Sequence, residues 1–251
     1  PAKIEEAISN DTTAILATHV YGNPCDIDAI QKIADKHSLK VIYDAAHCFG
    51  TKYKGNSVFE FGDISTTSFH ATKLFHSIEG GAVITKNPEL LKKMSYLRNF
   101  GHDGHEKFES LGINGKNSEF HAAMGLLNLK HIESIYESRK KQSLYYDIAL
   151  KNLDHVKPKI HKYAEFNYAY YPILLPNEKI ALQIIEELNK NWVYPRRYFY
   201  PSLNLLNYVD NIPMPVAESA SVRVLCLPLF HALTYEEIDF IARLMIRVQN
   251  N

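Results

Sequence analysis

Strand-like and helical segments alternate along the first hundred residues of the chain, and this order constrains the fold more than any other feature. Short runs of apolar and β-branched residues predict strands at residues 13–18, 40–44, 63–69 and 81–85. Helical spacing of apolar residues predicts a helix capped by Asp26, and Pro88 opens another that runs to about residue 99. Alternation of this kind is typical of an α/β domain in which helices pack on a largely parallel sheet.

The second half of the chain has a different character. Between residues 117 and 151 there is no Pro and Gly occurs only at Gly125, which predicts one long helix. Beyond it we expect a smaller α+β region, with strands at 167–175 and 222–227 and helices at 178–189 and after 234. The predicted organisation is a large domain over residues 1–130, followed by a linking helix and a small domain over residues 131–251.

Composition and charge exclude several classes of protein. The 28 Lys and Arg residues balance the 28 Asp and Glu residues, so binding to nucleic acid through bulk positive charge is not expected. No apolar run has the length of a membrane-spanning helix, and the first residues lack the pattern of a signal peptide. The three cysteines are widely spaced and form no CxxC pair, which predicts reduced thiols in a cytoplasmic protein and no metal site.

Two ionisable residues stand out by their place in this pattern. Asp44 ends the predicted strand 40–44, and open α/β sheets bind their ligands at the carboxyl ends of parallel strands. Lys73 follows the next strand, shortly after Ser68 and shortly before a pair of glycines. Taken singly, Asp44 could be a turn or cap carboxylate and Lys73 a solvated surface lysine. Their joint spacing favours a shared site.

The motifs around these two residues resemble the DegT/DnrJ/EryC1/StrS family of pyridoxal-phosphate-dependent sugar aminotransferases. The resemblance covers essentially the whole chain, and motifs of the family fall at residues 19–30, 43–47, 62–65, 68–73, 79–82, 97–101, 112–114 and 225–229. It implies the α/β fold of PLP-dependent transferases of fold type I, the aspartate aminotransferase type. That fold has a mixed, mostly parallel sheet and a smaller C-terminal α+β domain.

By this resemblance, five residues bind the cofactor pyridoxal 5'-phosphate. Lys73 is the catalytic lysine, which forms a Schiff base with the aldehyde of the cofactor, and Asp44 is the carboxylate that keeps the pyridine nitrogen protonated. His47 is expected near the phenolic oxygen, and Ser68 on the phosphate. Asn114 is expected to reach the phosphate in the neighbouring subunit, so the resemblance implies a homodimer with shared active sites.

The same resemblance implies the substrates, a nucleotide-linked keto sugar and glutamate as the amino donor. Residues 69–73 (Phe-His-Ala-Thr-Lys) resemble the family members that aminate C4, which favours a dTDP-4-keto-6-deoxyhexose and a role in O-antigen or other surface polysaccharide synthesis. His19 and His70 are placed to contact the substrate. Arg197 and Tyr198 could bind its nucleotide diphosphate, since Arg clamps phosphates and aromatic rings stack on bases; a solvated basic turn is the alternative.

The chain departs from the family pattern in two places. Family members carry a further N-terminal segment before the point that corresponds to Pro1, and parts of it hold the phosphate and stack on the pyridine ring. We therefore expect the chain to be the C-terminal two-thirds of an aminotransferase. After Asn114, the family's Tyr and Arg are replaced by Gly115 and Lys116, and Lys116 keeps the positive charge but not the bidentate geometry of Arg.

Three other functions compete with this one. A truncated, non-catalytic homologue would keep the subunit interface but bind no cofactor. A related PLP-dependent sugar dehydratase has His in place of the catalytic lysine, so the presence of Lys73 argues against it. A nicotinamide-binding Rossmann protein needs a G-x-G-x-x-G motif after a strand, and no predicted strand is followed by one.

Overall fold

The computed structural model describes residues 1–250, which form two compact units. The N-terminal unit comprises Pro1–Glu133 and Ile160–Asn167. The C-terminal unit comprises Ser134–Lys159 and the chain from Tyr168 onward. The return of Ile160–Asn167 to the N-terminal unit has no signal in the sequence, because it rests on contacts with residues far away along the chain. No helix in the described part is both long enough and apolar enough to cross a bilayer.

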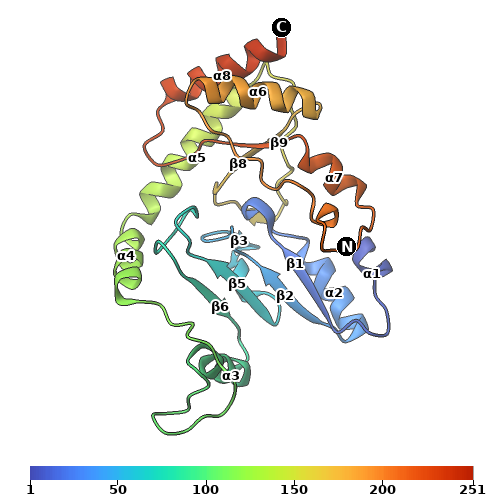
Figure 1. Ribbon diagram of the computed structural model, residues 1–251, viewed down its shortest axis with the longest axis vertical. Coiled ribbons are helices and arrows are strands. Elements are labelled where there is room, and N and C mark those ends of the chain that lie inside the picture. The colour runs from blue at the N-terminus through green and yellow to red at the C-terminus, as the bar shows by residue number, and fades with distance from the viewer. Residues whose placement is uncertain (251) are drawn as a thin grey trace. The chain divides into compact units, whose positions relative to one another are not determined.

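A four-stranded sheet forms the centre of the N-terminal unit (Figure 1). Its strands, in spatial order, are β1 (Ala14–Thr18), β2 (Lys40–Asp44), β5 (Ile64–Ser68) and β6 (Gly81–Ile84). The first three run parallel and β6 runs antiparallel to β5, which confirms the predicted mixed, mostly parallel sheet. Because β1, β2 and β5 are parallel, their carboxyl ends meet at one edge.

One face of this sheet is covered by α2 (Ile27–His37), with residues of α1 (Ala2–Glu6) packed beside it. The α2 helix begins where the sequence predicts, because the Asp26 carboxylate accepts a hydrogen bond of 3.2 Å from Ala29 N. The largest apolar side chains of this core are Ile15, Ile27, Ile30, Ile33, Val41, Tyr43, Tyr53 and Val58. Burial of each aliphatic member contributes about 1.5–3 kcal/mol.

The opposite face of the sheet is largely open. Residues that pair directly across strands point to the same face of the sheet. One such row crosses all four strands and consists of Thr18, Asp44, Thr66 and Val83. Val83 is 49% exposed, and Leu16, two residues before Thr18 and therefore on the same face, is 70% exposed. Asp44 thus lies on the open face, at the carboxyl edge of the sheet.

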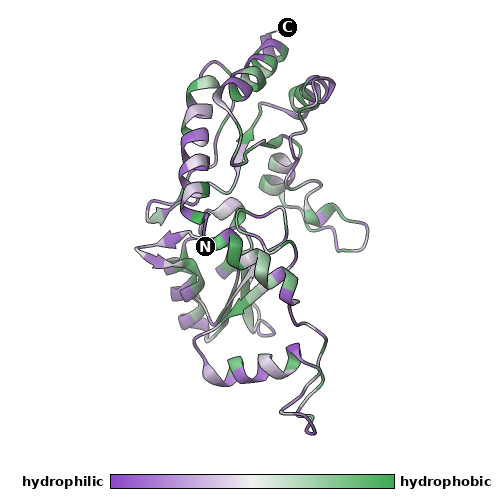
Figure 2. Cartoon of the chain, turned by 90° about the vertical axis from the view of Figure 1, so that its left-hand side faces the viewer, coloured by the Kyte–Doolittle hydropathy of each residue, from purple (hydrophilic) through white to green (hydrophobic). Residues whose placement is uncertain are grey.

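The remaining elements of the N-terminal unit surround this sheet. A small antiparallel sheet joins β3 (Lys52–Tyr53), β4 (Asn56–Ser57) and β7 (Ala164–Glu165). Two short 3-10 helices, η1 (Val20–Gly22) and η2 (Val58–Glu60), follow β1 and β4. The two later helices are α3 (Pro88–Arg98), along which apolar and polar positions are mixed (Figure 2), and α4 (Glu119–Leu129).

The C-terminal unit packs helices on a two-stranded antiparallel sheet. Its strands are β8 (Tyr171–Leu174) and β9 (Val224–Leu227). Its helices are α5 (Ile132–Ala149, of which the first two residues belong to the N-terminal unit), α6 (Glu178–Lys190), α7 (Pro215–Ser221) and α8 (Tyr235–Asn250), with the 3-10 helix η3 (Leu203–Leu205). One buried cluster joins α5, both strands, α6 and α8, and Tyr146, Ile173, Ile184 and Met245 are fully buried in it.

The prediction of one long helix between residues 117 and 151 is wrong. The chain forms α4 and α5, which are separated at Lys130 and His131. At this point Lys130 N donates to Leu127 O and His131 N donates to Asn128 O. Each bond joins residues three apart, as in a 3-10 helix, and not four apart, as in an α-helix. Neither Gly nor Pro marks the break, and for that reason helical composition alone does not reveal it.

Candidate active site

The carboxyl ends of three neighbouring strands bring polar residues together. His19 follows β1, Asp44 ends β2 and Ser68 ends β5. His19 N donates to Asp44 O at 2.9 Å, which extends the ladder between β1 and β2 by one step. The Asp44 carboxylate accepts a 3.0 Å bond from Ala46 N, so its orientation is fixed by the turn that follows the strand. The carboxylate remains available on the open face of the sheet.

Lys73 lies on a closed loop between β5 and β6. The neck of this loop is made at Phe69, whose N donates to Gly80 O at 2.8 Å and whose O accepts from Ser77 N at 2.9 Å. Within the loop, Lys73 N donates to His70 O at 2.9 Å. The lysine is partly buried, and it is followed by Leu74 and Phe75, which are 6% and 5% exposed. Buried neighbours on its C-terminal side therefore hold the loop against the unit.

Lys73, Asp44 and His47 influence one another electrostatically. Burial lowers the pKa of the Lys73 amine, and the negative charge of Asp44 opposes that shift. Burial also lowers the pKa of His47 to about 4, with the positive charge of Lys73 acting in the same direction and Asp44 against it. His47 is therefore neutral at pH 7, and Lys73 loses its proton more readily than an ordinary lysine. A lysine whose pKa is lowered by burial is a stronger candidate for covalent chemistry with a carbonyl group than an ordinary lysine.

His19 is fully buried in the turn beside this group. Its ring stacks on Tyr43 with 4.5 Å between the centroids, and its Nδ1 accepts a 3.0 Å bond from Cys25 N. Nδ1 is thus an acceptor, and the proton of the neutral ring lies on Nε2, which has no hydrogen-bond partner among the described residues. Burial lowers the pKa of His19 to about 4, against the influence of Asp44. Its predicted contact with a substrate stays a prediction.

Ser68 and His70 organise the first turn of the loop. Ser68 Oγ accepts a 3.3 Å bond from His70 N. The His70 ring lies between Thr72, whose Oγ1 is 2.8 Å from Nδ1, and Glu79, whose Oε1 is 3.6 Å from Nε2. The imidazole is therefore held on the outer side of the loop that carries Lys73. Both residues lie within five residues of Lys73 along the chain. Their predicted roles in binding the phosphate and the substrate stay predictions.

The turn that carries His47 depends on two residues that the sequence did not single out. Asn167 is 4% exposed, and its amide donates to His47 O at 2.8 Å and to Phe49 O at 3.0 Å. Gly22 faces it with φ +86°, and a Cβ on Gly22 would lie 2.4 Å from the Asn167 side-chain oxygen. Only glycine fits there. Asn167 carries no local signal, because its partners lie more than a hundred residues earlier in the chain.

Asn114 lies on the exposed segment that follows α3. It pairs with Asn99 in an isolated antiparallel bridge, and its side-chain oxygen accepts a 2.8 Å bond from Lys116 Nζ. Lys116 in turn lies over the ring of Phe100, 4.2 Å from its centroid. The structure does not bring Asn114 into hydrogen-bond contact with Asp44, Ser68 or Lys73 within the described residues. This exposed place leaves Asn114 accessible to another molecule.

Arg197 and Tyr198 belong to the C-terminal unit. The Arg197 guanidinium donates to Glu178 Oε1 and to Val222 O, both at 2.9 Å, and it lies 3.6 Å from the centre of the Tyr200 ring. Tyr198 packs edge-on against Tyr170 with 5.9 Å between the ring centroids. Arg197 is thus already paired inside its own unit, and the predicted contact of these two residues with a nucleotide diphosphate stays a prediction.

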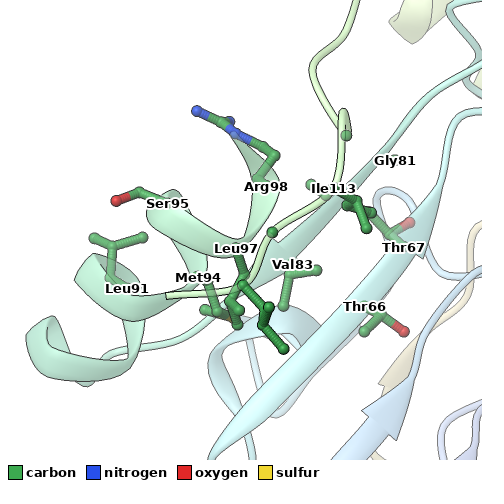
Figure 3. A pocket seen from close by; sticks show the side chains of 14 residues that line it. Thr66, Thr67, Gly81, Val83, Leu91, Met94, Ser95, Leu97, Arg98 and Ile113 are labelled. Carbon is green, nitrogen blue, oxygen red and sulfur yellow. The ribbon is translucent and has the colours of Figure 1, made fainter. Parts of the chain in front are cut away.

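A hollow of about 860 Å³ adjoins the polar residues on the open face of the sheet (Figure 3). In this view, Met94 and Leu97 of α3 point toward Val83 of β6. The hollow reaches Thr66 and Gly81, which pair with Asp44 and Ser68 across the sheet. Most of its lining is apolar, so the polar chemistry of this region lies at its edge, where the parallel strands end.

Comparisons with known proteins agree with this geometry. The model of the DegT/DnrJ/EryC1/StrS aminotransferase family matches residues 1–245. The dTDP-4-amino-4,6-dideoxy-D-glucose transaminase of Shigella dysenteriae is 38% identical over 95% of this chain and 67% of its own length. The protein of the same name from Escherichia coli is 39% identical over 97% of this chain and 68% of its own length.

Solved structures give the same result. The crystal structure of DesI in the presence of its TDP-sugar product is 30% identical, with a TM-score of 0.89 over 98% of this chain and 65% of that one. PseC of Helicobacter pylori, an aminotransferase involved in pseudaminic acid biosynthesis, is 28% identical with a TM-score of 0.86. The chain spans about two thirds of the length of these relatives.

These matches confirm the predicted fold type I and the resemblance to sugar aminotransferases that depend on pyridoxal phosphate. The family model covers nearly the whole chain, and two relatives are 38% and 39% identical to it. The chain belongs to the DegT/DnrJ/EryC1/StrS aminotransferase family.

Proposed function

We propose that this protein transfers an amino group from glutamate to a nucleotide-linked keto sugar, with pyridoxal phosphate as its cofactor. The observation that carries this proposal is the electrostatic coupling of Lys73, Asp44 and His47 at the carboxyl edge of a parallel sheet. Partial burial lowers the pKa of a lysine and so raises the fraction of its amine that is neutral. A larger neutral fraction brings no benefit to a structural lysine, but it helps an amine that must react with a carbonyl group.

The donor set fits pyridoxal phosphate. The cofactor, when bound, supplies a protonated pyridine ring that accepts the electrons of the C–H bond being broken. It needs an amine for its aldehyde, a carboxylate for its ring nitrogen, a donor for its phenolic oxygen and hydroxyl or amide donors for its phosphate. Asp44 and Ser68 supply these groups from the ends of β2 and β5, and His47 and Lys73 supply them from the loops that follow those strands. The unpaired, buried Nε2 of His19 adds one donor that the described residues do not use.

Each side chain then has a distinct task. Asp44 holds the proton on the ring nitrogen by its negative charge. His47 is neutral, and because its Nδ1 accepts a 3.0 Å bond from Tyr21 N, its proton lies on Nε2, from which it can be donated. Lys73 takes the proton from the amino-bearing carbon of glutamate and returns one to the sugar carbon. A lowered pKa suits Lys73 for these steps, because it makes the neutral amine that accepts a proton more available.

The keto sugar is proposed to be a dTDP-4-keto-6-deoxyhexose, which is aminated at C4 for O-antigen or other surface polysaccharide synthesis. The proposal rests on residues 69–73 and on the two relatives named dTDP-4-amino-4,6-dideoxy-D-glucose transaminase. His19 and His70 would lie near the sugar, and Arg197 and Tyr198 near the nucleotide. None of the three cysteines forms a disulfide within the described residues. Reduced cysteines of this kind support a cytoplasmic location.

Product analysis tests this proposal. The full-length protein is incubated with pyridoxal phosphate, glutamate labelled in its amino nitrogen, and a panel of keto sugars that differ in nucleotide and in keto position. We expect the labelled nitrogen to appear in a sugar carrying dTDP, and spectroscopy of the product to place it on C4. Label at C3, or in a GDP or UDP sugar alone, would overturn the proposed substrate. Absence of label from every sugar would overturn the activity.

A homodimer with shared active sites is part of the proposal. The segment from α3 through α4 exposes many large apolar side chains, which are Leu91, Leu97, Phe100, Phe108, Leu111, Ile113, Phe120, Leu126, Leu127 and Leu129. Exposed apolar surface on this scale is typical of a protein–protein interface. We propose that a second copy covers this segment, so that Asn114 of one subunit reaches the phosphate site of the other, as closed two-fold symmetry allows.

Subunit mixing tests the shared site. Lys73→Ala protein and Asn114→Ala protein are mixed under conditions that exchange subunits. If Asn114 serves the partner's site, each mixed dimer has one site with both residues intact and one with neither. We expect activity above that of either parent, rising to about half of the wild-type value per mixed dimer, since intact sites add independently. Activity equal to the average of the parents, with exchange proven by mass spectrometry, would mean that Asn114 acts within its own subunit or not at all.

A further inference from the structure

The loop that carries Lys73 is fastened at two places. The first is its neck at Phe69, and the second is an aromatic cluster beneath the loop. Phe49 stacks on Phe75 with 4.2 Å between the centroids, and Phe69 meets Phe75 edge-on at 5.1 Å. Phe75 lies two residues after Lys73, so this cluster fixes the chain close to the amine. The rest of the loop, from His76 to Glu79, has no anchor in this cluster.

The α4 helix holds this part of the loop in addition to the neck bond from Ser77 N to Phe69 O. It lies beside the loop (Figure 1), and Gly125 is its only buried residue. A Cβ on Gly125 would lie 3.4 Å from the Ser77 Cβ and 3.8 Å from the Phe75 ring, so the helix backbone rests directly on the loop. Three residues later, on the same side of the helix, Asn128 Nδ2 donates a 2.8 Å hydrogen bond to His76 O.

We propose that Asn128 is a positioning residue for Lys73. Its bond to the His76 carbonyl holds the return half of the loop against α4, and the neck bonds of Phe69 then keep the amine at the strand edge beside Asp44. This inference rests on the proposed function of Lys73. Asn128 touches neither cofactor nor substrate. It acts through His76, three residues beyond the lysine, whose carbonyl accepts the short bond and whose ring nitrogens lie 3.4 and 3.5 Å from Asn128 Nδ2.

The test compares Asn128→Leu with Asn191→Leu. Leucine has the same number of side-chain heavy atoms as asparagine and the same branching at Cγ, but it is bulkier and cannot donate a hydrogen bond. Asn191 is a matched control, because its Nδ2 donates an equally long 2.8 Å bond to the backbone carbonyl of Glu187, at the end of α6 in the C-terminal unit. Three quantities are measured: the urea midpoint, the hydrogen exchange of the Phe69 and Ser77 amides in the cofactor-free protein, and the rate at which added pyridoxal phosphate becomes fixed to Lys73 by borohydride.

We expect Asn128→Leu to speed the exchange of both amides and to slow the fixation at Lys73, each by about tenfold, which is the effect of one buried hydrogen bond. Asn191→Leu should lower the urea midpoint without changing either quantity. If Asn128→Leu lowers the midpoint while exchange and fixation stay at their wild-type values, Asn128 is merely structural and the inference is overturned.

Two further outcomes are distinguishable. If Asn128→Leu does not fold, the milder variant Asn128→Ser takes its place with the same readouts and the same expected directions. If the wild-type protein itself shows no fixation at Lys73, the proposed function of Lys73 fails, and the role of Asn128 falls with it. A third result separates the two claims. If pyridoxal phosphate becomes fixed to Lys73 in the wild type, and the Asn128 variant matches the wild type in both fixation rate and amide exchange, only the inference about Asn128 is overturned.

Discussion

Replacement of Lys73 by Ala will abolish amination. Among the described residues of the site, Lys73 carries the only amine, and a methyl group can neither bond the aldehyde of the cofactor nor move the proton between the carbons. We expect multiple-turnover activity below about one per cent of wild type, measured as transfer of labelled nitrogen from glutamate to the sugar. Sustained turnover above that level would remove Lys73 from its proposed role.

Lys86→Ala is the matched control for this variant. Lys86 lies in the same unit, its side chain is 71% exposed, and it forms a surface ion pair of 3.4 Å with Glu60. Such pairs contribute about 0–1 kcal/mol, so the protein should keep its stability and its full activity. A comparable loss in both variants would show that any missing lysine impairs the protein, and the assignment of Lys73 would lose its support.

Asp44→Asn will slow amination by a factor of about 10²–10⁴, because an amide has no negative charge with which to hold the proton on the pyridine nitrogen. The substitution keeps the size of the side chain and the oxygen that accepts the 3.0 Å bond from Ala46 N, so the fold should be unaffected. Single-turnover measurement of the glutamate half-reaction isolates this step. A rate near that of wild type would place Asp44 outside the site.

The same variant makes a second, independent prediction about charge. In the wild type, Asp44 opposes the lowering of the Lys73 pKa by burial. With that charge removed, the pKa of Lys73 falls further, so the neutral amine persists to lower pH. The pH profile for fixation of pyridoxal phosphate to Lys73 should therefore move to lower pH in Asp44→Asn. An unchanged profile would mean that the two groups do not interact.

Rules that act between residues close in the sequence predicted the strands of the sheet and the starts of two helices. The alternation of segments gave the strands of the sheet, and Asp26 and Pro88 marked the starts of their helices because caps act within one turn. The β3–β4 hairpin was missed, although Lys54 and Gly55, both with positive φ, form the two-residue turn that joins its strands. The break between α4 and α5 was missed because no residue type signals it.

The same distinction between local and distant signals applies to the residues of the site. Asp44 and Lys73 could be found from sequence, because the end of a parallel strand is a local feature with a general consequence. Asn167 and Asn128 could not, since each is a single amide whose bond reaches a carbonyl in a distant part of the chain. The lowered pKa values of His19 and His47 were equally hidden, because burial depends on the packing of the whole unit.

The central claim is that Lys73 binds the cofactor at the carboxyl edge of the sheet, and one measurement tests it most directly. The full-length protein is mixed with pyridoxal phosphate, treated with borohydride to make any carbon–nitrogen bond permanent, digested, and analysed by mass spectrometry. The account predicts a single modified peptide carrying the pyridoxyl group on Lys73, and no such peptide when glutamate is added first in excess. Modification at another lysine, or none at Lys73, would contradict it.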